Sequence, residues 1–282
     1  MKIGFCMLLW TTSVGEEHRP LLEDLKATGY DGVEIPVFAG TPEDYAKIGN
    51  MLDELELDRT AISVIPTLDK NPLSADSGTR KASVDYLKWC ADCTAALGAT
   101  TIGGPLHQTL GEFSGSATTA EEFDRAREVH TRAGDYARDA GVTFALEAVN
   151  RFESYFANTM AQLDSYVESV NHSAIKTMYD TFHANIEEAN PISAFTEHKQ
   201  NVVHVHISEN DRGVPGRGHV PWQETFKVLK SEGYDQWLTI EAFGRGLPDL
   251  AAATRVWRDF AESPEAVYRE GYKTIRNGWD QA

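Results

Sequence analysis

Basic residues are scarce in this chain, and long apolar runs are missing. The 282 residues include 26 Lys and Arg against 43 Asp and Glu, a formal net charge of −17. A field of that sign repels nucleic-acid phosphates and anionic lipid headgroups, so we expect neither nucleic acid nor a membrane as a partner. No apolar stretch approaches the roughly 18 residues of a membrane-spanning helix, and no charged-then-apolar leader opens the sequence. We therefore expect a cytoplasmic protein.

Cysteine is also rare, which argues against a disulfide framework. The three cysteines are Cys6, Cys90 and Cys93, an odd and small number that fits a reducing compartment. Cys90 and Cys93 form a CxxC, but it lies inside the helical pattern VDYLKWCADCTAALG, and no second pair completes a metal site. We interpret the pair as helix-core residues rather than a redox or zinc motif.

A GxGxxG after an early strand is missing as well, which weakens the case for a doubly wound open sheet. Instead, short apolar segments alternate with helical patterns, and glycine repeatedly ends a helix just before a strand. Strands are expected at residues 2–9, 32–36, 60–65, 100–103, 142–149, 175–180, 202–207 and 237–241. Helices are expected at residues 16–28, 42–57, 77–97, 119–140, 159–170, 191–199, 221–232 and 247–260. This alternation predicts an α/β protein, a single (β/α)₈ TIM-barrel domain over residues 1–282, with an extra C-terminal helix at 264–279.

Four polar residues interrupt apolar runs where the predicted strands meet their loops: Glu147, Asp180, His206 and Glu241. In a (β/α)₈ barrel these strand ends face one shared pocket. Three converging carboxylates would repel one another, and a divalent cation would relieve that repulsion. Three oxygen ligands and one imidazole suit Mn²⁺, Mg²⁺ or Co²⁺. The alternative is four separate buried polar residues, each hydrogen-bonded to a neighbouring strand.

The stretch VVHVHISENDR adds two details to this pattern. His204 and His206 are two residues apart, so on a strand they share a face. We expect His204 to be a structural residue one layer below the mouth and His206 to be the metal ligand. Further polar residues follow the strand ends at short intervals and should lie on loops over the same mouth, although each alone could be a surface charge: Glu153, His183 and Arg212.

The segments LEAVNRFE, MYDTFHANIEE, VVHVHISENDRGVPGRGHVPW and WLTIEAFG resemble the xylose isomerase-like barrels, and within them the D-tagatose 3-epimerase group of ketose 3-epimerases. The resemblance implies one divalent metal ion, usually Mn²⁺, bound by Glu147, Asp180, His206 and Glu241. It also implies substrate contacts from Glu153, His183 and Arg212, and a homo-oligomer, either a dimer or a tetramer. The first half of the chain matches less well. The wall at the far end of the sugar would draw on Phe5, Trp10, Ile65, Pro66, Leu106 and Phe113.

Together, the residues and the resemblance predict a metal-dependent epimerase that interconverts unphosphorylated ketoses at C3. One of Glu147 and Glu241 would remove the C3 proton, and the other would return a proton to the opposite face of a cis-enediolate. An aldose–ketose isomerase, or an enzyme acting on hydroxypyruvate or a keto-inositol, would use the same enolisation. A metal-dependent endonuclease shares the barrel, but the net charge opposes it. A non-catalytic sugar-binding protein would not need both glutamates.

Overall fold

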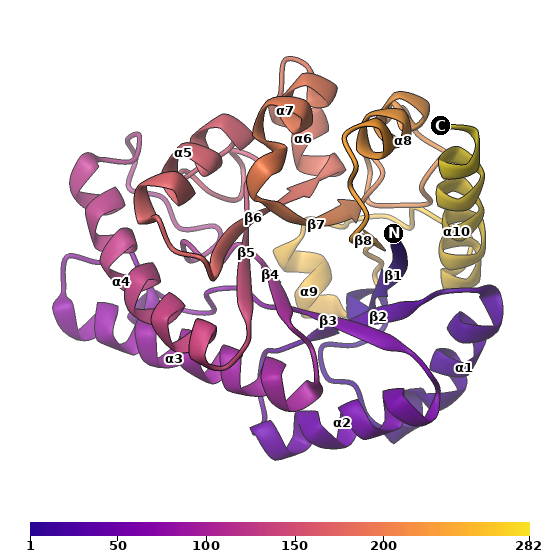
Figure 1. The fold of residues 1–282 in the computed structure, drawn as a ribbon, viewed down its shortest axis with the longest axis horizontal. Coiled ribbons are helices and arrows are strands. Elements are labelled where there is room, and N and C mark those ends of the chain that lie inside the picture. Colours follow the sequence, from indigo (N-terminus) through magenta and orange to yellow (C-terminus); the bar gives the residue numbers. More distant parts are fainter.

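Eight parallel strands form a closed barrel in the computed structural model, which describes residues 1–282 (Figure 1). Each strand pairs with the next along the chain, and the last pairs with the first. The strands are β1 (Lys2–Cys6), β2 (Gly32–Pro36), β3 (Asp58–Ile62), β4 (Thr101–Gly104), β5 (Thr143–Glu147), β6 (Ile175–Asp180), β7 (Val202–Ile207) and β8 (Trp237–Ile240). The predicted (β/α)₈ barrel is confirmed.

Helices surround this barrel on its outer side, except for the short helix at residues 248–253, which lies over the end of the barrel beside the cavity (Figure 1). They are α1 (Arg19–Thr28), α2 (Pro42–Glu54), α3 (Ser77–Leu97), α4 (Ala120–Asp139), α5 (Met160–Val170), α6 (Thr181–Glu187), α7 (Pro191–His198), α8 (Trp222–Ser231), α9 (Pro248–Ala253) and α10 (Pro264–Gln281). Several begin at side-chain caps, as at Thr119, whose Oγ1 accepts from the Glu122 N–H. α3 ends at Gly98, whose φ of +82° is the left-handed conformation that glycine adopts without strain. Helix α10 is the extra C-terminal helix that the sequence predicts.

Several element boundaries differ from those predicted, and one helix is added. The first strand stops at Cys6, and residues Met7–Leu9 form a 3-10 turn instead. The helix expected over 247–260 ends at Ala253, and Arg255 beyond it has a left-handed φ of 61°, which a continuing helix does not allow. The short helix α6 was not predicted; it begins at the end of β6, where the Asp180 carboxylate accepts from the Phe182 and His183 N–H groups.

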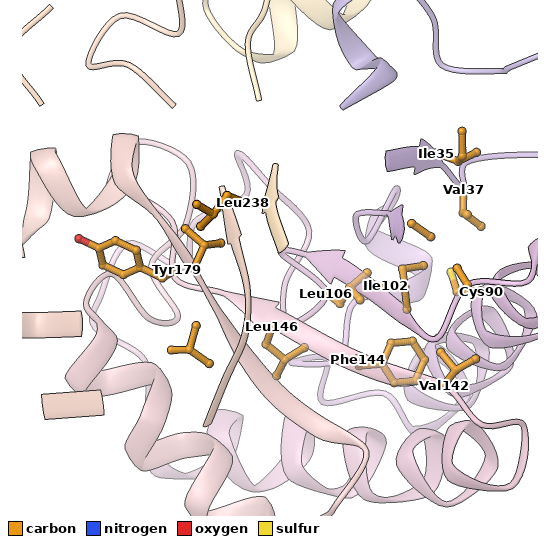
Figure 2. Close-up of a cluster of buried hydrophobic side chains, with 14 of the residues drawn as sticks. Ile35, Val37, Cys90, Ile102, Leu106, Val142, Phe144, Leu146, Tyr179 and Leu238 are labelled. Carbon is orange, nitrogen blue, oxygen red and sulfur yellow. The ribbon is translucent and has the colours of Figure 1, made fainter. Parts of the chain in front are cut away.

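The hydrophobic core lies between the strands and the surrounding helices. Figure 2 shows Ile102, Phe144 and Leu146 from the strands gathered with Cys90 of α3 in this layer. Because side chains alternate along a strand, Phe144 and Leu146 face the helices while Glu147 faces the barrel interior. Cys90 and Cys93 are both buried in α3 with free thiols, so the interpretation as helix-core residues is confirmed.

No helix has both the length and the apolar character that crossing a bilayer would require. Helix α10 packs against α1, α8, β1 and β8, which ties the end of the chain to its beginning. The organisation of residues 1–282 as one domain stays a prediction.

Candidate metal centre and active site

The structure brings the four predicted strand-end residues together. Glu147 ends β5, Asp180 ends β6, His206 lies near the end of β7, and Glu241 directly follows β8. Parallel register places Asp180 opposite His206, so that adjacent strands deliver their polar ends at one level. One ligand atom from each residue lies within 4.8 Å of the others, and all four side chains are buried. We call these four residues the ring.

Burial and neighbouring charges shift the pKa values of two carboxyl groups of the ring in opposite directions. Burial raises the pKa of Glu147 well above its usual range, and the nearby charges of Asp180 and Glu241 raise it further against the opposing effect of His206 and Arg212. Burial also favours the neutral form of Asp180, but Arg212 and His206 outweigh it and lower the pKa of that carboxyl well below its usual range. Without a cation, Glu147 is therefore held toward its neutral acid, while Asp180 stays ionised beside Arg212.

The donor atoms of the ring fit a divalent cation. Glu147 Oε1 and His206 Nδ1 are buried without a hydrogen-bond partner, a costly arrangement unless something else binds there. His206 Nδ1 lies 3.5 Å from Asp180 Oδ2 and 3.4 Å from Glu241 Oε2, so the imidazole nitrogen faces the carboxylates. Three carboxylates and one imidazole can hold a metal ion of the Mn²⁺, Mg²⁺ or Co²⁺ type.

Arg212 is more closely tied to the ring than the sequence predicts. Its Nη1 donates to Asp180 Oδ2 at 2.9 Å and to Glu241 Oε2 at 2.6 Å. The residue has a left-handed φ of 63°, and its guanidinium carbon lies 4.0 Å from the centre of the Phe182 ring. A non-glycine residue in this backbone region is strained, and such strain is common where a side chain must be aimed. The expected substrate contact of Arg212 stays a prediction.

His183 and Glu153 lie beside the ring, and Asn150 positions both. The Asn150 main-chain N–H donates to His183 Nδ1 at 3.0 Å, and its side-chain amide donates to Glu153 Oε1 at 2.8 Å. Burial, together with the charge of Arg212, lowers the pKa of His183 to about 4, so the imidazole of His183 is neutral. His183 Nε2 lies 3.0 Å from Arg212 Nη2, which can only donate, and 3.5 Å from Glu147 Oε1. His183 therefore bridges Asn150 on one side and Arg212 on the other, next to Glu147.

A cavity of about 330 Å³ opens above these residues. Glu147, Glu153, His183, Arg212 and Glu241 line its polar side. Apolar side chains line the opposite walls, among them Leu8, Phe38, Ile62, Ile65, Pro66 and Phe243. A compact polar floor with apolar walls is typical of a site for a small polar ligand.

The predicted far wall of the cavity is only partly correct. Ile65 and Pro66 do line the cavity. Phe5 and Leu106 are instead buried in the core. Phe5 lies on the outward face of β1, where it packs against Tyr30. Trp10 lines a separate cavity with Phe260. Phe113 is 50% exposed and lies outside the site.

Two acidic residues with clear structural partners were missed by the sequence analysis. Glu34 of β2 is fully buried beneath the ring and contacts both His204 and His206. Its signal was present, since it is the lone charge inside the apolar strand GVEIP. Glu209 is fully buried in the loop after β7, and its carboxylate accepts from Trp222 Nε1 at 2.8 Å and the Gly216 N–H at 2.8 Å. It anchors the glycine-rich loop that carries Arg212.

Comparison with known proteins bears on the identity of this site. A family model described as xylose isomerase-like TIM barrel matches residues 22–277. The chain belongs to this family.

Relatives within the family indicate which class of reaction the site catalyses. The chain is 31% identical to a ketose 3-epimerase of Arthrobacter globiformis over 98% of this chain and 96% of the relative. It is 30% identical to an L-ribulose 3-epimerase of Mesorhizobium japonicum over 100% of this chain and 95% of the relative. The solved structure of a D-allulose 3-epimerase from Methylomonas sp. with D-allulose aligns with a TM-score of 0.91 and 26% identity, over 98% of this chain and 96% of that one. This xylose isomerase-like chain is thus an isomerase of the ketose epimerase group, as the resemblance implied.

Proposed function

We propose that this protein is a metal-dependent epimerase that interconverts unphosphorylated ketoses at C3. The observation that carries the proposal is the placement of Glu147 and Glu241. They come from β5 and β8, the outer two of four consecutive strands, and both line the cavity above the ring. Two carboxylates that flank one substrate can serve as base and acid on its two faces, which is what inversion of a carbon centre requires.

The ring would hold one divalent cation, Mn²⁺ first and Mg²⁺ or Co²⁺ as alternatives, and this cation would supply Lewis-acid polarisation of the substrate carbonyl. One glutamate takes the C3 proton, which leaves a cis-enediolate of the sugar, and the other delivers a proton to the opposite face of C3. His183 contacts a sugar oxygen, Glu153 accepts from a sugar hydroxyl, and Arg212 donates to a further oxygen. Each of these groups lines the cavity.

An unphosphorylated substrate fits the charge of the cavity. Its lining carries Glu147, Glu153 and Glu241 against Arg212 and Arg255, so the side chains alone present more negative than positive charge to an added phosphate dianion. The D-allulose bound by the Methylomonas relative is an uncharged sugar, which supports the same substrate class here. The expected dimer or tetramer stays a prediction, which sedimentation of the purified protein would test.

The decisive experiment offers a panel of ketoses with Mn²⁺ in D₂O. D-fructose, D-tagatose and L-ribulose are each incubated with the protein, and products are identified by chromatography and NMR. We expect the C3 epimer of at least one ketose, with deuterium at C3. An aldose product with deuterium at C2 would instead identify the isomerase alternative. If no ketose gives a C3 epimer and none gains deuterium at C3, the proposal is refuted.

A further inference from the structure

Glu34 is a fully buried carboxylate on β2, below the ring rather than in it. It does not line the cavity above, so it does not reach the substrate. A buried carboxylate is destabilising by several kcal/mol unless it is paired and hydrogen-bonded. The groups that contact the Glu34 carboxylate therefore indicate its role.

Both oxygens of Glu34 have defined neighbours. Oε2 accepts a hydrogen bond from His206 Nε2 at 2.9 Å. Oε1 accepts from Thr60 Oγ1 at 3.1 Å and lies 2.8 Å from His204 Nε2. Glu34 therefore accepts a hydrogen bond on each of its two oxygens.

The hydrogen bond to Glu34 fixes which nitrogen of His206 faces the ring. A neutral imidazole has one N–H and one lone pair. With Nε2–H committed to Glu34, the lone pair is on Nδ1, and Nδ1 faces Asp180 and Glu241 without a hydrogen-bond partner of its own. A carboxylate behind a ligating histidine fixes its tautomer and orientation and makes the other nitrogen a stronger ligand.

We propose that Glu34 is a positioning residue that presents His206 Nδ1 to the metal ion, an inference that rests on the proposed function for the presence of that ion. Glu34 acts from across the barrel, 172 residues away in the sequence. His204 lies beneath His206, with 5.1 Å between the two ring centres. Its Nε2 contacts the other oxygen of the Glu34 carboxylate, Oε1.

A second ion between Glu34, His204 and His206 is the competing interpretation, because their ligand atoms also lie within 4.8 Å of one another. The hydrogen-bond geometry between His206 Nε2 and Glu34 Oε2 favours a shared proton instead. The two interpretations differ in stoichiometry, which is one ion per chain in our proposal and two in the alternative.

The test measures Mn²⁺ binding by titration calorimetry in wild type and Glu34→Gln, independently of turnover. Glutamine keeps the shape of the side chain but removes its charge. We expect binding to weaken about 10- to 100-fold, and the visible spectrum of bound Co²⁺ to change because His206 is less firmly oriented. Unchanged Mn²⁺ affinity, or two ions per wild-type chain, would overturn the inference. A wild-type protein that binds no Mn²⁺ would instead overturn the proposed function.

A matched control separates positioning from loss of structure. Asp164 is another buried carboxylate paired with a histidine, His198 Nδ1 at 2.9 Å, but it lies on α5 away from the cavity. Asp164→Asn should lower thermal stability and leave Mn²⁺ affinity unchanged. If Glu34→Gln does not fold, Thr60→Val removes only the hydroxyl on Oε1. A few-fold loss of Mn²⁺ affinity there supports the inference, and wild-type affinity overturns it.

Discussion

Arg212 Nη1 donates to Glu241 Oε2 across 2.6 Å, and the same nitrogen donates to Asp180 Oδ2 across 2.9 Å. A permanent positive charge is thus held among the carboxylates that we assign to a divalent cation. The guanidinium is buried, and the ion pairs with Asp180 and Glu241 compensate for its desolvation. Arg212 and the metal ion should therefore both stabilise this part of the protein.

Removal of the Arg212 charge should make stability depend on metal. Arg212→Met is expected to lower the free energy of unfolding in EDTA by about 3–5 kcal/mol, because the partners of a buried ion pair lose their cation. Saturating Mn²⁺ should recover part of that loss, since a ligand that binds only the folded state stabilises it. Urea unfolding of wild type and variant, with EDTA or with MnCl₂, measures both effects. An equal deficit in the two conditions would contradict the shared role.

Glu147→Gln and Glu241→Gln should each reduce kcat by about 10²–10⁴-fold or more, because each removes one of the two proton-transfer groups. The fold should persist, since burial already raises the pKa of Glu147 and favours an uncharged side chain there. Initial rates on the active ketose, circular dichroism and Tm measure these outcomes. Glu43→Gln, at an exposed position in the first turn of α2, is the control. Substantial turnover in both active-site variants would rule out the two-glutamate mechanism.

The loop that carries Arg212 should depend on Glu209. Burial favours the neutral form of Glu209, but Trp222 Nε1 and the N–H groups of Asn210, Gly216 and Val220 outweigh it and lower its pKa. Glu209→Gln should destabilise the protein by about 1–3 kcal/mol, the cost of leaving buried donors unsatisfied. It should also speed proteolysis within residues 213–218. Trp222→Phe removes one of these bonds and should show a smaller effect. Equal protease resistance in all three proteins would argue against this anchor.

Buried histidines should make the protein less stable in mild acid. Burial is the main cause that lowers the pKa of His107 and of His130 to about 4 each, against about 6.5 in an unfolded chain. Between these values the unfolded state binds more protons, so the free energy of unfolding falls as the pH falls from about 6.5 to about 4. Each histidine contributes a slope of about 1.4 kcal/mol per pH unit within that window.

His130→Gln tests one of these contributions. The variant lacks the titrating group that bonds Tyr166 and the Leu106 carbonyl, so its stability should depend less steeply on pH than that of the wild type. Urea unfolding at several pH values between 4.5 and 6.5 gives the two slopes. Parallel slopes would show that His130 titrates normally in the folded protein.

The sequence by itself determined the barrel and the members of the ring. Alternating apolar and helical segments are local patterns, and a carboxylate or histidine at the end of an apolar run is visible without any partner. Glu147, Asp180, His206 and Glu241 each had that local signal, and the closed order of strands brings them together. Element ends were less certain, because the turn after Cys6 and the stop at Ala253 depend on single backbone conformations.

Only the tertiary structure decided what lies around and beneath the ring. Glu34 meets His206 because barrel closure places β2 across from β7, and no local pattern in either strand records that approach. The insertion of Arg212 between Asp180 and Glu241 depends on one left-handed residue in a loop. Phe5 faces the helices rather than the cavity because the orientation of β1 in the barrel selects which alternate side chains point inward. These relationships depend on how the eight strands close into a barrel and on which side chains of each strand point inward, and both are properties of the assembled barrel.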